Sequence, residues 1–216
     1  MRIGDRAWLV DHEPPVTPAL SDRVLWLAGA IRAAAGTLAD DVVPALTSVC
    51  VQASTPQRAE AIGAVLRALI DEPPPVTRHE GRLVELPVNY GGVDGPDLDA
   101  VAEATGLTAG QVVARHTAPV YRVWMLGFMP GFPYLGPVDP SIQVPRLDTP
   151  RVRVPAGSVG LAGAQTGIYP RESPGGWQII GRTGEWLFDP GRTPPARLSP
   201  GDRVRLVAAA GGAQPR

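Results

Sequence analysis

Hydrophobic and polar residues follow a helical period in two segments of the first seventy residues. Apolar side chains recur every three or four positions at 20–31 and again at 62–69, which is typical of helices that bury one face. A Thr-Pro pair stands just before each segment, at 17–18 and at 55–56. Such a pair supplies an N-cap followed by a proline at the first helical position. We therefore predict two amphipathic helices that begin alike.

Strand-like stretches alternate with these helices. Residues 7–10 precede the first helix, 42–53 contain two β-like stretches between the helices, and 82–90 follow the second. The order β, α, β, β, α, followed by a further strand, suggests a small ferredoxin-like α+β unit. We place a domain boundary near residue 80, which gives an N-terminal α+β domain at 1–80 and a second domain at 81–216.

The pattern changes after His116. Residues 97–104 and 108–115 are predicted to form two short helices, and Thr108 with Gln111 supplies a capping box for the second. The apolar stretches that follow are short and are separated by Gly, Pro and Asp, as in β-barrels and β-sandwiches. The clearest predicted strands are at 121–126, 177–180, 186–188 and 204–207. The expected fold class is therefore α+β, with a β-barrel or sandwich in the second domain.

Composition narrows the possible functions. The chain has 216 residues, 44% hydrophobic content, a formal net charge of −1 and a pI near 6.3. This charge offers no basic field to a phosphate backbone, so we expect no nucleic-acid partner. Every basic residue is an arginine, because the sequence contains no lysine. Schiff-base and lysine-nucleophile mechanisms are therefore excluded.

Cysteine, histidine and apolar runs add three expectations. The single Cys50 lies in an alternating strand pattern, and we assign it to the core rather than to a nucleophile. The three histidines lack ligand spacing, so we predict no metal site. No apolar run approaches the roughly 20 residues of a membrane span, and the N-terminus lacks a signal segment. We expect a cytoplasmic protein with no membrane partner.

The run 128–177 is denser in Pro, Gly, aromatic and Arg residues than a fold requires, and we place the functional site there. The aromatic residues that would wall a pocket are Phe128, Phe132, Tyr134, Tyr169 and Trp177. The forked donors suited to a carboxylate or phosphate are Arg146, Arg151, Arg153, Arg171 and Arg182. Aromatic residues among strands also serve as core. For Arg153 we favour surface solvation, because the alternation at 151–154 is that of a half-exposed strand.

Two segments imitate catalytic motifs. Residues 176–183 follow the pattern G-x-x-x-x-G-R-T, but Arg182 replaces the lysine of a phosphate loop and the interior is strand-forming. Residues 156–160 resemble a nucleophile elbow, yet Ser158 precedes Gly-rich positions that would not start the required helix. We expect neither a nucleotide loop nor a serine nucleophile, and we interpret Ser158 as a hydrogen-bonding loop residue.

His116 has two interpretations. It falls at the C-terminal end of a predicted helix, where the helix dipole favours its protonated form, just before the strand that leads into the loop-rich run. It is a candidate proton-transfer group, and it is equally a capping or packing histidine. On the first interpretation, the substitution His116→Ala abolishes turnover and leaves thermal stability nearly intact.

A set of ordered motifs carries a family resemblance. The motifs are YGG at 90–92, GFMPGF at 127–132, VPAGS at 154–158, QTGIYP at 165–170 and SPGGW at 173–177. On these motifs the chain resembles the family of the 5-oxoprolinase B subunit, also known as the kinase A inhibitor KipI or allophanate hydrolase subunit 1 family. The resemblance runs from residue 4 to about residue 207. It implies an N-terminal α+β domain and a C-terminal cyclophilin-like β-barrel.

The resemblance also implies a function. The family includes one component of a bacterial ATP-dependent 5-oxoprolinase, which opens 5-oxo-L-proline to L-glutamate while hydrolysing ATP. This B component works with a C subunit of similar cyclophilin-like fold and with an A subunit, and which of the three binds ATP stays open. The alternative is a KipI-like regulator that binds a sensor histidine kinase and blocks its autophosphorylation. Prolyl isomerase activity and urea chemistry rank below both.

The candidate roles of individual residues follow from this. We expect His116 in proton transfer and Arg146 and Arg182 as anion contacts. Asp97 either caps its helix, which we favour, or places a carboxylate in the site. The polar pocket members are predicted to be Gln165, Thr166 and Tyr169. The residues expected to shape the pocket are Phe128, Pro130, Phe132, Gly157, Ser158, Gly175, Gly176 and Trp177.

Overall fold

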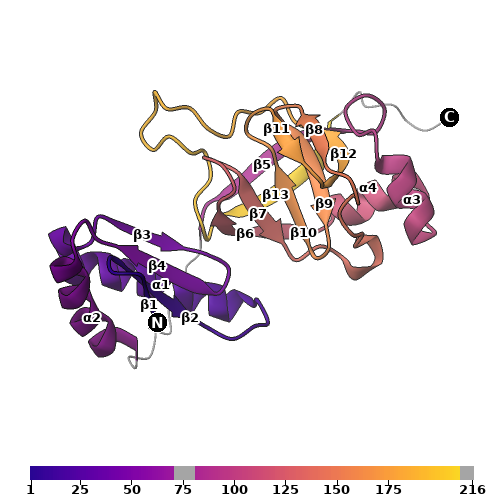
Figure 1. Ribbon diagram of the computed structural model, residues 1–216. Helices are drawn as coiled ribbons and strands as arrows, with labels where there is room; N and C mark the ends of the chain where they lie inside the picture. Colours follow the sequence, from indigo (N-terminus) through magenta and orange to yellow (C-terminus); the bar gives the residue numbers. More distant parts are fainter. Residues whose placement is uncertain (71–80, 210–216) are drawn as a thin grey trace. The chain divides into compact units, whose positions relative to one another are not determined.

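The structure, a computed structural model, describes residues 1–70 and 81–209. The chain divides into two compact units, Met1–Glu80 and Gly81–Arg216, which Figure 1 colours from indigo to yellow along the sequence. Within the described residues, no helix is both long enough and apolar enough to cross a bilayer.

The first unit is a four-stranded antiparallel sheet with two helices on one face (Figure 1). Its elements are β1 (Arg2–Ile3), β2 (Ala7–Asp11), α1 (Pro18–Ala35), β3 (Asp41–Pro44), β4 (Ser48–Gln52) and α2 (Pro56–Ile70). The Thr17 hydroxyl accepts a hydrogen bond from the Leu20 amide at 3.1 Å, and the Thr55 hydroxyl accepts one from the Arg58 amide at 3.3 Å. Both predicted helix starts are therefore confirmed.

The strand order of this sheet, β1-β2-β4-β3, is ferredoxin-like except at one edge. The stretch at 82–90 lies beyond the predicted boundary at residue 80 and forms β5 (Leu83–Tyr90) of the second unit, so it does not supply the fourth strand of the ferredoxin-like order. The short strand β1 pairs with β2 at this edge of the sheet, in the place of the fourth strand of a ferredoxin-like unit. Alternation along β5 buries Leu86, Val88 and Tyr90 in the core of the second unit, and that burial decides where the strand pairs.

Cys50 lies on the face of the first sheet that is opposite the two helices. Its neighbours Val49 and Val51 are fully buried against the helices, so the two-residue period of β4 turns Cys50 the other way. Its cross-strand neighbours on that face are Leu9 and Val43. The assignment of Cys50 to the core is wrong, because it is half-buried outside the helix-covered face, although the strand itself was predicted correctly.

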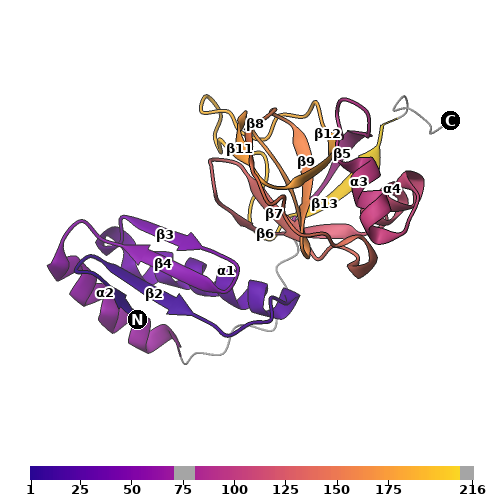
Figure 2. The same ribbon diagram turned by 45° about the vertical axis from the view of Figure 1, so that its right-hand side comes forward.

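The second unit is built on a closed seven-stranded barrel (Figure 2). Besides β5, its elements are α3 (Leu98–Thr105), α4 (Ala109–Thr117), β6 (Val120–Leu126), β7 (Pro133–Gly136), β8 (Arg151–Val154), β9 (Ser158–Ala162), β10 (Gln165–Ile168), β11 (Ser173–Gly175), β12 (Gln178–Arg182) and β13 (Arg203–Ala208). The barrel order is β10-β7-β6-β13-β5-β12-β9, while β8 and β11 form a separate two-stranded ribbon. The capping box of Thr108 and Gln111 is present. The predicted α+β class with a barrel in the second domain is confirmed.

The barrel wall separates two apolar clusters. Val159 and Leu161 of β9 belong to the interior core, together with Leu98 and Val112 of the two helices. Side chains alternate across a strand, so Ala162 faces outward. There it joins an outer cluster whose buried members are Phe132, Val154, Ala162, Tyr169, Trp177 and Ile179.

The strand predicted at 186–188 does not form. Only Phe188 makes an isolated bridge, to Ala196. The segment that would have to pair with it contains Pro190, Pro194 and Pro195, and proline cannot donate to a ladder. Apolar composition alone was therefore insufficient evidence for a strand at this position.

Candidate functional site

Five aromatic side chains gather on the outer face of the barrel, and we call them the outer aromatic cluster. They are Phe128, Phe132, Tyr134, Tyr169 and Trp177. The Phe132 ring lies at the centre, with centroid distances of 5.0 Å to Tyr134, 5.2 Å to Tyr169 and 5.5 Å to Trp177, all near edge-to-face. This geometry is the favourable one for aromatic pairs. The aromatic residues predicted to wall a pocket are thus neighbours in space.

Phe128 is presented by a strained turn. It is the one non-glycine residue with positive φ, +64°, among those that the structure describes. The Met129 amide donates to the Gly127 carbonyl at 2.7 Å, which is the hydrogen bond of a γ-turn centred on Phe128. Such backbone strain costs about 1–3 kcal/mol and concentrates at functional sites. It holds a ring that is 60% exposed at the edge of the cluster, 6.3 Å from the ring of Tyr169.

Positive charge and backbone donors surround the phenol of Tyr169. Burial raises the pKa of Tyr169, while the backbone amide of Trp177 and the guanidinium groups of Arg146 and Arg151 oppose that rise. The guanidinium carbon of Arg146 lies 5.8 Å from the centroid of the Trp177 ring. A Cβ on Gly175 would stand 2.3 Å from the Tyr169 hydroxyl, so only glycine lets β11 cross there. These groups suit a negatively charged ligand.

Arg151 and Asp97 connect three elements beside this phenol. Arg151 Nη2 lies 2.5 Å from Asp97 Oδ1, and Asp97 Oδ2 accepts a hydrogen bond from the Ile179 amide at 2.6 Å. The Asp97 side chain accepts no hydrogen bond from helix α3, whose N-terminus it precedes. Capping by Asp97 is therefore corrected, because its carboxylate is occupied by β8 and β12. Arg151 Nη1 is buried and has no hydrogen-bond partner among the described residues.

Arg182 lies at the end of β12 and fastens a neighbouring loop. Its Nε donates to the Ala156 carbonyl at 2.8 Å, and its closest carboxylate oxygen, from Asp94, is 4.0 Å away. Next to Ala156, Gly157 has φ +81°, and a Cβ there would stand 2.1 Å from the Thr183 carbonyl oxygen. The proposal that Arg182 contacts an anion stays a prediction.

His116 is fully buried inside the barrel unit. Its Nδ1 is 2.8 Å from the Tyr90 hydroxyl, its Nε2 is 2.9 Å from the Thr166 hydroxyl, and Thr166 donates to the Gly160 carbonyl at 2.9 Å. Because Thr166 gives its only proton to Gly160, it must accept from Nε2–H. Tyr90 then donates to Nδ1. This assigns the neutral Nε2–H tautomer, with both ring nitrogens satisfied.

The helix dipole, which favours the protonated form, does not decide the charge of His116. Burial lowers the pKa of His116 to about 3, because desolvation outweighs the helix dipole. Thr166 lies three positions before Tyr169, so the two side chains fall on opposite faces of the β10 segment. The structure therefore places His116 and Thr166 in the interior, apart from the outer aromatic cluster. Proton transfer by His116 stays a prediction, but its removal can no longer be expected to leave stability intact.

The remaining predicted residues shape the loops around the outer face. Gln165 begins β10 at the hairpin end of the strand, where it pairs with Ala162. Gly176 accepts a hydrogen bond from the Leu147 amide at 2.8 Å, which ties the loop of Arg146 to Trp177. Pro130 is exposed in the β6–β7 connection.

The structure also shows the conformation of the two segments that resemble catalytic motifs, at 156–160 and 176–183. Ser158 begins strand β9, so no helix follows it as an elbow requires. Strand β12 occupies most of 176–183, so this segment forms no phosphate loop. The strand-forming interior expected at 176–183 is confirmed, whereas the interpretation of Ser158 as a loop residue is wrong, because it belongs to β9.

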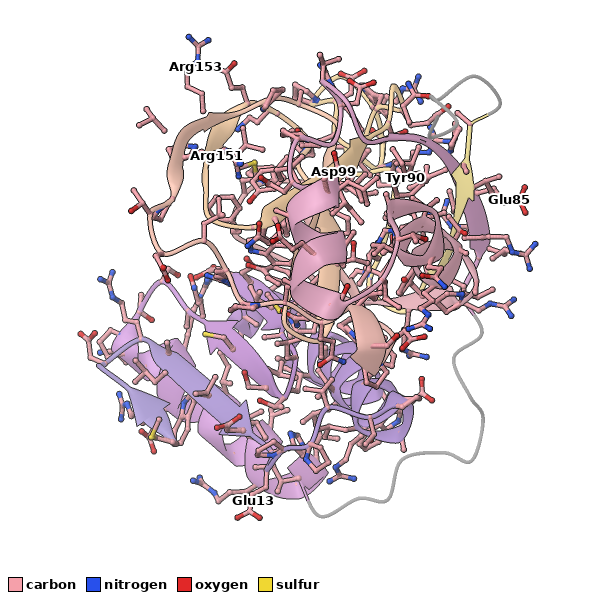
Figure 3. The ribbon with its side chains drawn as sticks, turned by 90° about the vertical axis from the view of Figure 1, so that its right-hand side faces the viewer. Glu13, Glu85, Tyr90, Asp99, Arg151 and Arg153 are labelled. Atoms are coloured by element: carbon pink, nitrogen blue, oxygen red, sulfur yellow. The ribbon has the colours of Figure 1, made fainter. Side chains whose placement is uncertain are left out.

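Arg151 has a contact that its sequence neighbourhood does not indicate. Its alternation with Val152 and Arg153 is that of an ordinary strand, and nothing local separates the two arginines. The structure separates them: the Arg151 side chain is 32% exposed, whereas that of Arg153 is 75% exposed and pairs with Glu172. Figure 3 shows Arg153 extending away from the ribbon. Only the partner from a distant loop, Asp97, distinguishes Arg151.

Comparisons with known proteins agree with this architecture. The family model "Carboxyltransferase domain, subdomain C and D" matches residues 1–198. The 5-oxoprolinase B subunit of Escherichia coli O157:H7 is 44% identical over 207 residues, which cover 95% of this chain and 93% of that protein. The 5-oxoprolinase B subunit of Bacillus subtilis is 52% identical over 126 residues, 58% of this chain and 52% of that protein.

A solved structure shows the same fold within a longer chain. The crystal structure of TTHA0988 superposes with a TM-score of 0.84 at 41% identity, covering 97% of this chain. The match spans only 41% of the TTHA0988 chain. The chain thus belongs to the family of the carboxyltransferase domain, subdomains C and D, and within it to the family of the 5-oxoprolinase B subunit.

Proposed function

We propose that this chain is the B subunit of an ATP-dependent 5-oxoprolinase, which converts 5-oxo-L-proline to L-glutamate with hydrolysis of ATP to ADP and phosphate. The observation that carries the proposal is the 44% identity over nearly the full length of both chains with a relative of that name. The outer aromatic cluster, with two arginines around the Tyr169 phenol, supports it as a binding face for a small anionic molecule.

The proposed chemistry needs activation of an unreactive amide. The lactam of a five-membered ring is a poor electrophile, and a phosphoryl group on its oxygen would make the ring carbon reactive toward water. Addition of one water and cleavage of the C–N bond then give the free amine and an acyl phosphate, and a second water releases phosphate from this intermediate and leaves the carboxylate of glutamate. Groups that hold the substrate in one orientation and balance its charge contribute to such a step. This chain offers guanidinium groups, backbone amides and aromatic walls for that task.

ATP is a co-substrate of the proposed complex and supplies the phosphoryl group. The segment at 176–183 does not fit a phosphate cradle, because β12 runs through it as a paired strand. We therefore assign no nucleotide-binding residue to this chain. Which member of the complex binds ATP is part of the test below.

The proposed partners are the C and A subunits of the same enzyme. The length relation to TTHA0988 supports a partner, because more than half of that chain lies outside the part that matches this protein. Relatives named as subunits support it as well. In this proposal the chain has no complete activity alone.

Glutamate release tests the proposal. The chain is incubated with 5-oxoproline and ATP, first alone and then with its A and C partners, and glutamate and phosphate are measured. We expect stoichiometric release in the complete mixture only. If all three folded proteins together release no glutamate, the proposal fails, and the regulator that binds a sensor histidine kinase becomes the first alternative to test.

A further inference from the structure

Only one of the two terminal nitrogens of the Arg151 guanidinium has a partner among the described residues. Nη2 pairs with Asp97, while Nη1 is buried and hydrogen bonds to none of the described residues. A guanidinium presents a planar fork that matches a carboxylate, and a buried donor left unpaired is unfavourable. An acceptor oxygen brought by a ligand would correct this deficit. Arg153 offers no such opening, because its Nε and Nη2 donate to the two oxygens of Glu172 at 2.9 and 3.1 Å.

The charge around Arg151 indicates the ligand's charge. Arg146 and Arg151 both act on the Tyr169 phenol, and Asp97 neutralises one of these two cations. One positive charge is left over, together with the phenol hydroxyl, which accepts from the Trp177 amide and can donate its own proton. A single carboxylate balances this set, whereas a triphosphate would leave several charges unmatched.

The apolar side of the same phenol indicates the ligand's shape. The Tyr169 ring contacts Phe132 and Phe128, and Phe128 is held exposed there by the strained γ-turn. A protein gains nothing from strain that exposes an apolar ring to water, unless the ring contacts something in the functional state. A ligand that contacts both features needs a carboxylate for the arginine and a small apolar ring for the aromatic edge.

We propose that Arg151, positioned by Asp97 and assisted by Arg146, binds the carboxylate of a small cyclic acid whose ring rests against Phe128 and Tyr169. On the proposed function, on which this choice of ligand rests, the acid is the lactam substrate. In this proposal the outer face of the barrel is the part of the complex that selects the substrate. It recognises the carboxylate of the substrate.

Steady-state kinetics of the complex assembled with its A and C partners test this assignment. For Arg151→Gln we expect the KM for 5-oxoproline to rise about 10- to 100-fold, the effect of losing a charge-assisted hydrogen-bonded pair. The KM for ATP should stay unchanged. Arg153→Gln, two residues away on β8, is the matched control and should leave both KM values at their original level.

Two further variants separate binding from folding. Arg151→Lys keeps the charge beside Asp97 but loses the planar fork, so we expect it to fold and to retain a raised KM. The double substitution Asp97→Asn with Arg151→Gln removes both charges together and leaves no unpaired ion in the protein. Its melting temperature should lie close to that of the original chain, while its KM for 5-oxoproline stays raised.

The outcomes distinguish the inference from the proposed function. An active complex in which Arg151→Gln, Arg151→Lys and the double variant all keep the original KM overturns the inference and leaves the function standing. If the complex is inactive, ligand-observed NMR on the full chain decides. There the inference requires that 5-oxoproline binds, that Arg151→Gln abolishes this binding, and that 2-pyrrolidinone, which lacks the carboxylate, binds equally to both proteins. Absence of binding, or equal loss for both probes, overturns it.

Discussion

The interior of the barrel holds the buried His116 and its outer face the half-buried Arg151, and the two side chains differ in whether their buried nitrogens are all hydrogen bonded. Inside, both nitrogens of His116 are paired, with Tyr90 and Thr166. Outside, Arg151 pairs through one nitrogen and leaves the other buried and free among the described residues. Complete pairing fixes one neutral state, whereas an unpaired donor calls for an acceptor. Burial alone therefore does not separate the two side chains, and we base the proposal for Arg151 on its unpaired hydrogen-bond donor.

The same contrast holds for the backbone around the two groups. His116 lies in a regular helix next to regular strands, while the outer aromatic cluster is bounded by the positive φ of Phe128 and the close approach of Gly175 to Tyr169. Regular helices and strands stabilise the fold without backbone strain, whereas strained loops hold particular side chains in defined positions. Four experiments test this division, beginning with the largest expected effect.

Replacing the interior histidine should destabilise the protein most. For His116→Ala we expect the free energy of unfolding to fall by about 3–5 kcal/mol, since the hydroxyls of Tyr90 and Thr166 lose a partner and a cavity remains. Denaturant titration followed by circular dichroism measures this. His12→Ala in the first unit, where the ring is only half-buried, is the control for loss of an imidazole. Equal midpoints for His116→Ala and the original chain would show that the network is not structural.

Acid should destabilise the barrel unit through the same residue. The pKa of His116 is about 3 in the folded chain and near its ordinary 6.5 in the unfolded chain, so the unfolded state binds a proton first as the pH falls. The stability is fully present above pH 6.5 and is lost between pH 6.5 and about pH 3, at about 1.4 kcal/mol per pH unit. From pH 7 to pH 5 this amounts to about 2 kcal/mol.

A His116→Gln variant is the control for the acid effect. Its free energy of unfolding should depend less on pH over the same interval, because glutamine does not titrate. Chemical denaturation at pH 5, 6 and 7 measures both proteins under equal conditions. Parallel pH profiles would mean that other groups cause the acid sensitivity.

The strained turn can be tested with a matched pair of substitutions. Phe128→Ala and Phe128→Gly both remove the ring, but only glycine tolerates φ +64° without a penalty. We expect the glycine variant to be about 1 kcal/mol more stable than the alanine variant. Thermal unfolding compares them. An alanine variant at least as stable as the glycine variant would contradict strain at this position.

The smallest effect is expected at the exposed arginine. Arg153→Gln removes a surface ion pair with Glu172, and such pairs contribute about 0–1 kcal/mol. Its melting temperature and its KM for 5-oxoproline should both match those of the original chain. A loss of substrate affinity here as large as that of Arg151→Gln would remove the distinction between the two arginines of β8.

Many residues of the candidate site could be predicted from the sequence. Their separation into the barrel interior and the outer aromatic cluster could not. The dense run of Gly, Pro and aromatic residues identified Phe128, Phe132, Tyr169 and Trp177, which the structure brings together. His116 and Thr166, expected beside them, lie in the interior instead. Their faces are set by strand pairing and barrel closure, which depend on residues far apart in the sequence.

The sequence by itself determined the local structure of this protein. The helix starts at Thr17, Thr55 and Thr108 depend on groups within four residues, so they follow directly from residue type. Tertiary structure alone decided that β5 pairs with β13 in the barrel, and that Asp97 holds Arg151 across 54 residues rather than capping its own helix. The physical reason is that burial and ion pairing depend on which distant segments come into contact. A pattern along the chain contains information only about residues that are close in sequence.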